Sequence, residues 1–242
     1  MNAIKTVNLT KKYKDLVAVD RLNLQVQKGE LFSLLGVNGA GKTTLIKMLS
    51  CLTKPTDGDA FIEGNSIIKN KSEIKRVIGF SPQETAVAPN LTVKENLELI
   101  CGIHGFSKKK AQEKLSSLSE KLGLENILDK KTSKLSGGWQ RRVSIAMALI
   151  SEPTILFLDE PTLGLDVIAR SELWDIIRSL KGNVTIILTT HYMEEAEVLS
   201  DRIGIMKDGK LLVVGTPREL MEKTSSNTIE KAFISIAKEE KL

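Results

Sequence analysis

The sequence contains few of the residues that mark several common classes of protein. Of its 242 residues, two are cysteines, two are histidines and 4% are aromatic. Cys51 and Cys101 lie far apart and do not have the spacing of metal ligands, which excludes a cysteine-based zinc site. We expect both to be ordinary reduced, partly buried thiols of a cytosolic protein.

Long hydrophobic runs are also absent. The longest apolar stretches, such as 155–158 and 186–188, are far shorter than the roughly 18 residues of a membrane-spanning helix. The N-terminal residues lack the apolar core of a signal peptide. With 41% hydrophobic and 27% charged residues, the composition predicts a soluble globular protein with a substantial core.

The charge balance is basic, with a formal net charge of +5 and a pI of about 9.1. Basic residues cluster at 69–76, 108–110, 130–134 and 141–142. These clusters contain almost no aromatic residues for stacking on bases, so we expect no nucleic-acid partner. Two interpretations remain: an ordinary solvated surface, or a surface close to an anionic membrane.

One glycine-rich motif organises the interpretation of the chain. Residues 36–44 match G-x-x-x-x-G-K-[ST], the phosphate-binding P-loop, between a strand-like run at 31–35 and a helix-like segment at 44–49. A chance match in a glycine-rich turn is the alternative, but this strand, loop and helix order argues against it. The predicted nucleotide-binding residues here are Gly36, Asn38, Gly39, Ala40, Gly41, Lys42, Thr43 and Thr44.

The residue types of this motif suit a nucleotide. Gly36, Gly39 and Gly41 allow positive φ, so that backbone N–H groups at a helix N-terminus curl around an anion. Lys42 is expected to reach the β- and γ-phosphates, and the Thr43 hydroxyl to bind Mg²⁺.

The remaining pattern predicts an α/β protein with a helical insertion. Helical periodicity without a convincing strand covers 84–150, whereas buried-strand patterns return at 154–160 and 184–188. The other predicted elements are strands at 4–8, 22–26, 59–63 and 76–80, a hairpin of 203–206 with 211–214, a short helix from Thr216, and an amphipathic helix with Ile229, Phe233 and Ile236 on one side.

Candidate catalytic groups follow the predicted strands at one edge. The P-loop, Gln83, Asp159 with Glu160, and His191 each come just after a strand, and ligands bind at the carboxyl ends of parallel strands. Asp159 is placed to hold Mg²⁺, Glu160 to polarise the attacking water, and His191 to contact the γ-phosphate. The alternative for two acids at a strand end is a helix cap.

A second glycine stretch, 135–140, also precedes a predicted helix. Ser136 can cap that helix, while Gly137 and Gly138 expose its first N–H groups as a second anion site. One P-loop does not need two phosphate sites. A head-to-tail pair of chains, each closing on its partner's nucleotide, accounts for both.

With these motifs in order, the chain resembles the ATP-binding cassette (ABC) transporter ATPases over nearly its full length. Residues 135–140 resemble the signature loop, Gln83 the Q-loop, 163–166 the D-loop and His191 the switch histidine. Tyr13, otherwise readable as a surface tyrosine, matches the aromatic residue that stacks on adenine. Leu163 and Trp139 are bulkier than usual at their positions, which leaves open the fine geometry of dimer contacts.

The resemblance implies an α/β P-loop NTPase core with a mixed, mainly parallel sheet, an N-terminal antiparallel β-subdomain and an inserted helical subdomain. The core would comprise 1–83 and 151–220, the helical subdomain 84–150, and a C-terminal helical tail 221–242. It also assigns roles to further residues. The implied catalytic residues are Glu160, His191, Lys42 and Gln83; the implied metal ligands are Thr43, Gln83 and Asp159; and Ser136, Gly137, Gly138, Gln140 and Asp166 are implied to contact nucleotide.

The implied cofactors are ATP and Mg²⁺. The implied partners are a second copy of the ATPase subunit and a separate transmembrane permease, at the cytoplasmic face of the plasma membrane. Residues 190–197 and 228–233 resemble a branch that energises bacterial exporters of drugs, lipids or ions. A soluble non-transport ABC ATPase acting on a macromolecular assembly is the alternative function, but such proteins usually carry two cassettes in one chain.

Overall fold

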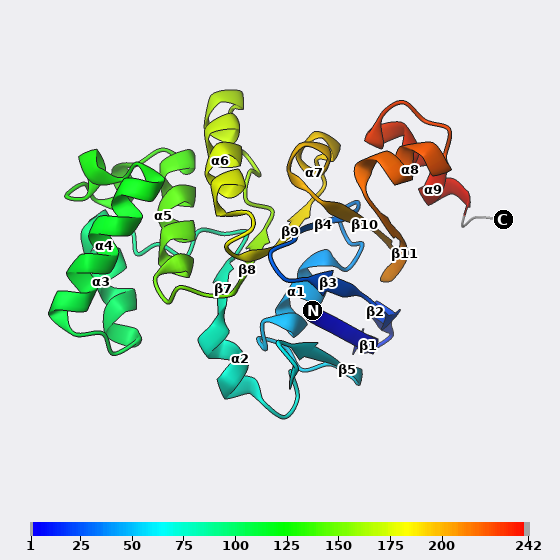
Figure 1. The fold of residues 1–242 in the computed structure, drawn as a ribbon, viewed down its shortest axis with the longest axis horizontal. Coiled ribbons are helices and arrows are strands. Elements are labelled where there is room, and N and C mark those ends of the chain that lie inside the picture. The colour runs from blue at the N-terminus through cyan, green and yellow to red at the C-terminus, as the bar shows by residue number, and fades with distance from the viewer. Residues whose placement is uncertain (1, 240–242) are drawn as a thin grey trace.

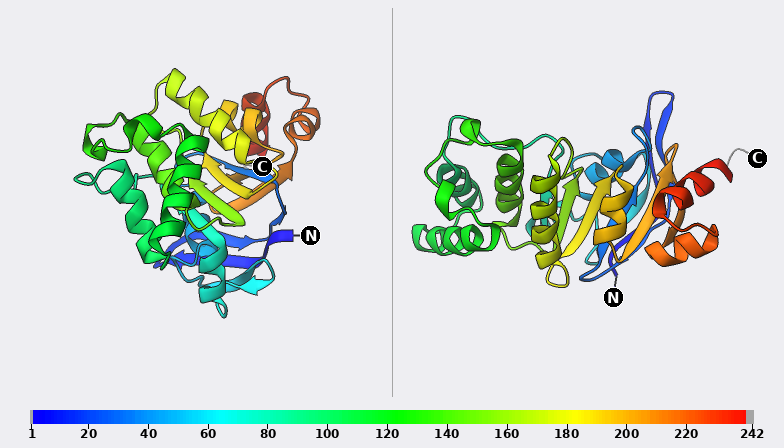
Figure 2. Two further views of the ribbon diagram at one scale, coloured as in Figure 1. Left: turned by 60° about the vertical axis from the view of Figure 1, so that its left-hand side comes forward. Right: turned by 90° about the horizontal axis from the view of Figure 1, so that it is seen from above.

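Two β-sheets and the helices around them make up the chain (Figures 1 and 2). The computed structural model describes residues 2–239, so the first residue and the last three residues of the predicted tail lie outside it. The larger sheet has the strand order β11-β10-β4-β9-β8-β7, and its neighbours are parallel except in the β10–β11 hairpin. Its strands are β4 (Leu31–Leu35), β7 (Ile78–Ser81), β8 (Ile155–Asp159), β9 (Thr185–Thr190), β10 (Arg202–Lys207) and β11 (Lys210–Gly215).

The smaller sheet is antiparallel, as expected. Its strands are β1 (Asn2–Tyr13), β2 (Leu16–Leu22), β3 (Gln25–Gln27), β5 (Asp57–Ile62) and β6 (Asn65–Ser66). The single strand predicted at 22–26 is wrong, because the chain leaves β2 at Leu22 and re-pairs with β1 as β3. Tyr13 ends β1 rather than lying in a turn, and the strand predicted from Arg76 starts at Ile78 because α2 (Lys71–Val77) precedes it.

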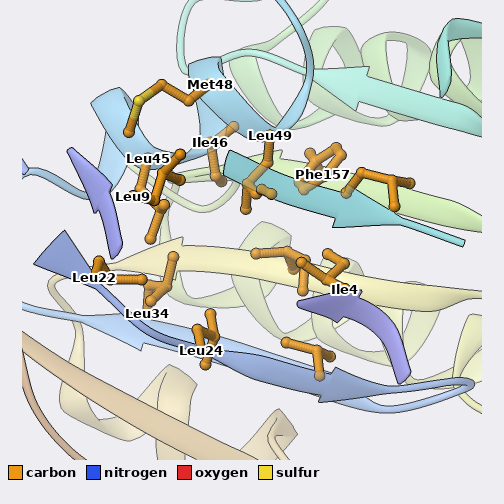
Figure 3. Close-up of a cluster of buried hydrophobic side chains, with 14 of the residues drawn as sticks. Ile4, Leu9, Leu22, Leu24, Leu34, Leu45, Ile46, Met48, Leu49 and Phe157 are labelled. Carbon is orange, nitrogen blue, oxygen red and sulfur yellow. The ribbon is translucent and has the colours of Figure 1, made fainter. Parts of the chain in front are cut away.

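The main core lies between the two sheets. Helix α1 (Lys42–Leu49) packs there, and side chains from both sheets and α1 meet in one cluster (Figure 3). Alternate residues of β8 face opposite sides: Phe157 points into this cluster, whereas Leu156 and Leu158 belong to a second cluster. Every residue of β4, β8 and β9 is buried. Their apolar runs had predicted strands that are covered on both faces.

The second cluster joins the helical region to the sheet. The described chain from 84 to 150 forms helices and turns, with one isolated bridge between Thr92 and Lys131. Its helices are α3 (Val93–Ile103), α4 (Lys108–Leu122) and α5 (Gly137–Leu149), with 3₁₀ turns at Glu125–Ile127 and Thr132–Lys134. Leu97, Leu118 and Val143 from these helices pack together with Leu173 of α6 (Val167–Leu180).

The C-terminal part continues from the sheet through α7 (Met193–Leu199), α8 (Pro217–Lys223) and α9 (Ile229–Glu239). Helix α8 begins with a capping box between Thr216 and Glu219, as its sequence indicates. Ile229, Phe233 and Ile236 are buried on one side of α9, which confirms the predicted amphipathic face. Within residues 2–239, no helix is long and apolar enough to cross a membrane.

Candidate functional site

The carboxyl ends of four parallel strands open onto one cavity of about 700 Å³. The P-loop leaves β4, Gln83 follows β7, Glu160 follows β8 and His191 follows β9. The prediction that these groups meet at one sheet edge is confirmed by the cavity wall, which contains a residue of each. The cavity is lined by Tyr13, Leu16, Val17, Ala18, residues 38–44, Gln83, Glu160, Leu163, His191, Asp208 and Gly209.

The glycines of the P-loop act in two different ways. Gly39 and Gly41 have φ of +83° and +100°, as predicted, and a Cβ on Gly41 would lie 2.3 Å from the carbonyl oxygen of Ala18. Gly36 does not have positive φ, so that expectation is wrong for it. It is needed for space instead, because a Cβ there would lie 2.5 Å from the carbonyl oxygen of Met206.

Lys42 holds its ammonium group inside the loop. Its Nζ donates to the carbonyl oxygens of Gly36 at 2.7 Å and Val37 at 3.2 Å, and lies 3.3 Å from Oε1 of Glu160. The Lys42 and Glu160 side chains are only 5% and 8% exposed, so this ion pair is weakly screened by solvent. A phosphate oxygen in the loop can take the place of these neutral carbonyl oxygens as a charged acceptor for the Lys42 ammonium group.

Asp159 is the acidic partner of the P-loop threonine. Thr43 Oγ1 donates to its Oδ1 at 3.0 Å, and Thr189 Oγ1 donates to the same atom at 2.6 Å. A hydroxyl and a carboxylate held together are hard oxygen ligands that fit Mg²⁺. The described residues contain no group of three or more His, Cys, Asp or Glu side chains that could hold a metal ion, so Thr43 and Asp159 would need further ligands of other kinds.

Glu160 and His191 form the second half of the site. His191 Nδ1 lies 2.6 Å from Glu160 Oε2, so the carboxylate is held between the imidazole and Lys42. The Glu160 backbone has φ of +48°, and its N–H donates to Oγ1 and the carbonyl oxygen of Thr189. Neither Asp159 nor Glu160 caps a helix, which removes the alternative considered for these two acids.

Thr189 is a residue that the sequence analysis missed. It binds Asp159 through its hydroxyl and Glu160 through two acceptor atoms, so it aligns both acids. The sequence feature that could have identified it is its place at the end of a buried strand, two residues before His191.

The second glycine stretch lies away from this cavity. Ser136 is the N-cap residue of α5, but its hydroxyl makes no capping hydrogen bond with the rest of the described chain, contrary to expectation. The Gln140 amide donates to the carbonyl oxygens of Thr132 and Leu135 at 3.1 and 3.2 Å. Asp166 caps α6 by accepting from Ala169 N at 2.9 Å.

Arg141 is a second residue that the sequence analysis missed, because the pair 141–142 looked like surface charge. It is 4% exposed, and its guanidinium donates to the carbonyl oxygen of Pro82 at 2.5 Å and to that of Gln83. Burial lowers the pKa of Arg141, and the charge of Asp159 opposes that shift. Arg141 therefore ties the helix after the signature-like stretch to the segment that enters the cavity from β7.

Tyr13 lines the same cavity as the P-loop and has 45% of its surface exposed. The turn residues Asp208 and Gly209 and the strand β2 residues Leu16 to Ala18 form the adjoining wall. These residues carry no recognisable sequence motif, because they come from two separate hairpins.

The geometry of the loop, the buried lysine, the threonine–aspartate pair and the sheet edge defines a P-loop ATPase of the α/β class. Comparison with known proteins then gives the family. Residues 19–163 match the family model described as ABC transporter. The chain therefore belongs to the ABC transporter family and carries its ATPase domain.

Two relatives illustrate the match. The chain is 40% identical over 239 residues to the probable multidrug ABC transporter ATP-binding protein YbhF of Escherichia coli, covering 96% of this chain and 41% of that protein. It is 39% identical over 229 residues to the daunorubicin resistance ATP-binding protein DrrA3 of Streptomyces coeruleorubidus, covering 94% and 72%. The chain thus spans about two fifths of YbhF and most of DrrA3.

Two solved structures are similar in fold. An ATP-binding subunit of an ABC transporter superimposes with a TM-score of 0.86 at 26% identity, covering 97% of this chain and 99% of that one. The dimeric cassette MJ0796, bound to ADP and Pi in a post-hydrolysis state, gives a TM-score of 0.79 at 30% identity, covering 88% and 98%.

Proposed function

We propose that this chain is the energy-coupling subunit of an exporter: two copies bind two ATP molecules between them, hydrolyse them with Mg²⁺, and drive a separate membrane permease. The observation that carries the proposal is the incomplete site. Every predicted phosphate-edge group lines or borders the cavity, whereas the signature-like stretch 135–140 does not contribute to it. The names of YbhF and DrrA3 support the drug-exporter class.

The residues of the cavity have separate roles in this proposal. Lys42 and the N–H groups of the P-loop bind the phosphates, while the Tyr13 ring stacks on adenine. Lys42 turns from Glu160 towards the γ-phosphate, which frees one carboxylate oxygen of Glu160 to accept a proton from the attacking water. His191 holds the other oxygen in place.

Thr43, Asp159 and Gln83 are the proposed Mg²⁺ ligands, directly or through water. When bound, Mg²⁺ neutralises charge on the β- and γ-phosphate oxygens. Thr189 keeps the Asp159 carboxylate aimed at Thr43, so the ligand pair is in place before the ion arrives.

The second copy supplies what one chain lacks. The N–H groups of Gly137 and Gly138, at the start of α5, are proposed to close on the partner's nucleotide together with the loop 163–166. Val167 and Ile168 beside that loop are 76% and 72% exposed, an apolar pair that a second copy can cover. The dimeric MJ0796 cassette supports this arrangement.

The test is the oligomeric state of Glu160→Gln, which is expected to bind ATP without turning it over. Light scattering should report a monomer without nucleotide and a dimer with ATP and Mg²⁺. A persistent monomer at high protein concentration would contradict the proposal. Ser133→Arg, at an exposed position of the preceding 3₁₀ turn, is the matched control. Ser136→Arg should prevent the dimer, and Ser133→Arg should not.

The permease is proposed to dock on the helical unit 84–150. Val87 and Leu91 are apolar candidates for a docking groove at the start of this unit, but both are half-buried, and Val87 packs against the second core cluster. The exposed apolar residues are Leu99 and Ile103, 48% and 71% exposed and one turn apart on α3. We therefore place the docking face there.

This placement has its own experiment. Leu99→Glu and Ile103→Glu should leave the ATPase activity of the purified chain within about threefold, because neither side chain lines the cavity. Both variants should abolish recruitment to membranes that contain the permease. Lys94→Glu, exposed on the same helix, is the control. Normal recruitment of folded Leu99→Glu and Ile103→Glu variants would show that the docking face lies elsewhere.

A further inference from the structure

A second group of buried polar side chains lies beside the Glu160–His191 pair. Its centre is Glu195 of α7, which is 0% exposed, and Trp174 Nε1 of α6 donates to its Oε1 at 3.1 Å. Helices α6 and α7 pack against each other beside the carboxyl ends of β8 and β9 (Figure 1). A carboxyl group is costly to bury unless its hydrogen-bonding capacity is used. The proposed reaction assigns no role to this one.

Three buried polar atoms in this group have no hydrogen-bond partner within residues 2–239: Oε2 of Glu195, Oγ1 of Thr162 and Nε of Arg170. Burial raises the pKa of Glu195, and the hydroxyls of Thr190 and Thr162, the Trp174 N–H and the Arg170 charge oppose this shift. The two hydroxyls and the Arg170 charge therefore lie near the carboxyl, and Oε2 itself makes no hydrogen bond within residues 2–239. One free acceptor beside two free donors can be satisfied by a small movement.

The position of these groups connects them to both partners of the pair. Thr162 lies two residues after Glu160, in the turn that leads to the loop 163–166. On the other side, Thr190 directly precedes His191. The Arg170 guanidinium packs 5.1 Å from the Tyr192 ring centroid, and that ring lies 4.2 Å from the His191 ring. Fixing this group thus fixes both Glu160 and His191.

We propose that Glu195 is a positioning residue for ATP hydrolysis: in the closed, ATP-bound dimer its free oxygen accepts hydrogen bonds from Thr162 and Arg170. These bonds hold the turn after Glu160 and the end of β9 in one alignment. Because the loop 163–166 belongs to the proposed dimer interface, closure supplies the movement that makes them. The inference rests on the proposed ATPase function, although Glu195 itself does not line the cavity.

The test separates turnover from binding in the full chain with ATP and Mg²⁺. Glu195→Ala should lower kcat about tenfold or more while KM and the affinity for a fluorescent ATP analogue stay within about threefold. Glu195→Gln keeps the shape and an acceptor oxygen, so it should recover most of that loss. Thr162→Val removes only a hydroxyl and should lower kcat about threefold.

A matched control distinguishes positioning from general stability. Glu30 is also buried, at 7% exposed, and accepts from Gln27 N and Arg202, but it lies at the amino end of β4. Glu30→Gln should lower thermal stability without the selective loss of kcat. Adding Thr162→Val to Glu195→Ala should lower kcat no further, since both remove the same bond.

Several outcomes would overturn the inference. If Glu195→Ala turns over ATP within twofold of the unmodified chain while Glu160→Gln does not, the role of Glu195 is wrong and the proposed function stands. If Glu195→Ala does not fold, an unchanged kcat in Thr162→Val would likewise show that the role of Glu195 is wrong. If the unmodified chain hydrolyses no ATP, the proposed function and this inference fail together.

Discussion

The chain contains two glycine-rich stretches that lead into helices, 36–44 and 135–140, and their surroundings in the structure differ. The first is enclosed: Gly41 is pressed against the Ala18 carbonyl, and Lys42 is 4% exposed in a shell of oxygens. The second is open: Ser136 and Gly137 are exposed, and a Cβ on Gly137 would meet only Leu165 Cδ2 at 3.8 Å.

This difference separates binding from turnover. A stretch whose donors and charges are already arranged around a cavity can bind a phosphate within one chain. A stretch whose N–H groups face solvent has the same helix-terminus chemistry but no wall opposite it. It requires a second surface, so changes in the two stretches should have different consequences.

The largest effect is expected at the carboxylate that the enclosed stretch holds. Glu160→Gln should lower ATP turnover by about 10² or more, because the attacking water loses its proton acceptor, while nucleotide affinity stays unchanged. Steady-state phosphate release and equilibrium binding measure the two quantities. Glu194→Gln, an exposed acid of α7, is the control. Equal turnover in Glu160→Gln and the unmodified chain would refute the role of Glu160.

The next largest effect tests binding by the enclosed stretch. Lys42→Ala should weaken ATP binding about 10- to 100-fold, because it removes a charge-assisted hydrogen bond to phosphate. Isothermal titration of the purified variant measures the affinity, with the exposed Lys47→Ala on the same helix as control. Unchanged ATP affinity in Lys42→Ala would show that the enclosed lysine does not hold the nucleotide, and the contrast between the two stretches would fail.

The open stretch should respond in the opposite way. Ser136→Arg should keep the chain's own ATP affinity within about threefold, because Ser136 does not line its cavity, and lower turnover about tenfold or more by blocking the partner. The same titration and phosphate-release assays apply. A loss of affinity that matches the loss of turnover would mean that 135–140 belongs to the chain's own site.

The smallest effect concerns stability rather than chemistry. Gly41→Ala should lower the free energy of unfolding by about 1–2 kcal/mol, because its φ is +100° and the new Cβ would meet the Ala18 carbonyl. Gly137→Ala should change it by less than about 0.5 kcal/mol, because its Cβ has room and alanine favours a helix. Urea denaturation compares the two. Equal destabilisation would show that both stretches are enclosed.

The success of the sequence analysis varied between these regions for a physical reason. The P-loop, its strand and its helix are consecutive, so local spacing was enough to predict Lys42 beside a buried strand end. Thr189 and Arg141 were missed because their partners, Asp159 and Gln83, lie 30 and 58 residues away in the chain. The part of the cavity wall where two distant hairpins meet, such as Gly209 beside Val17, carries no local sequence signal.

The predicted strand boundaries were wrong where strand pairing, rather than the hydrophobic pattern, determines where a strand ends. Residues 22–26 alternate like one strand, yet β1 pairs with β2 and β3 in turn, so the chain leaves the ladder between them. Likewise, Val87 looks like an exposed apolar residue in sequence. Its packing against the second core cluster is a property of how α3 and its neighbours meet.

The sequence by itself determined the buried strands of the larger sheet, the P-loop and the acids at strand ends, because each depends on neighbouring residues and on fixed backbone periods. Only the tertiary structure decided that Thr189 aligns two acids, that Ser136 faces away from the cavity, and that Glu195 lies buried between Trp174 and Thr190. These facts depend on contacts between segments far apart in the chain, and no local spacing encodes them.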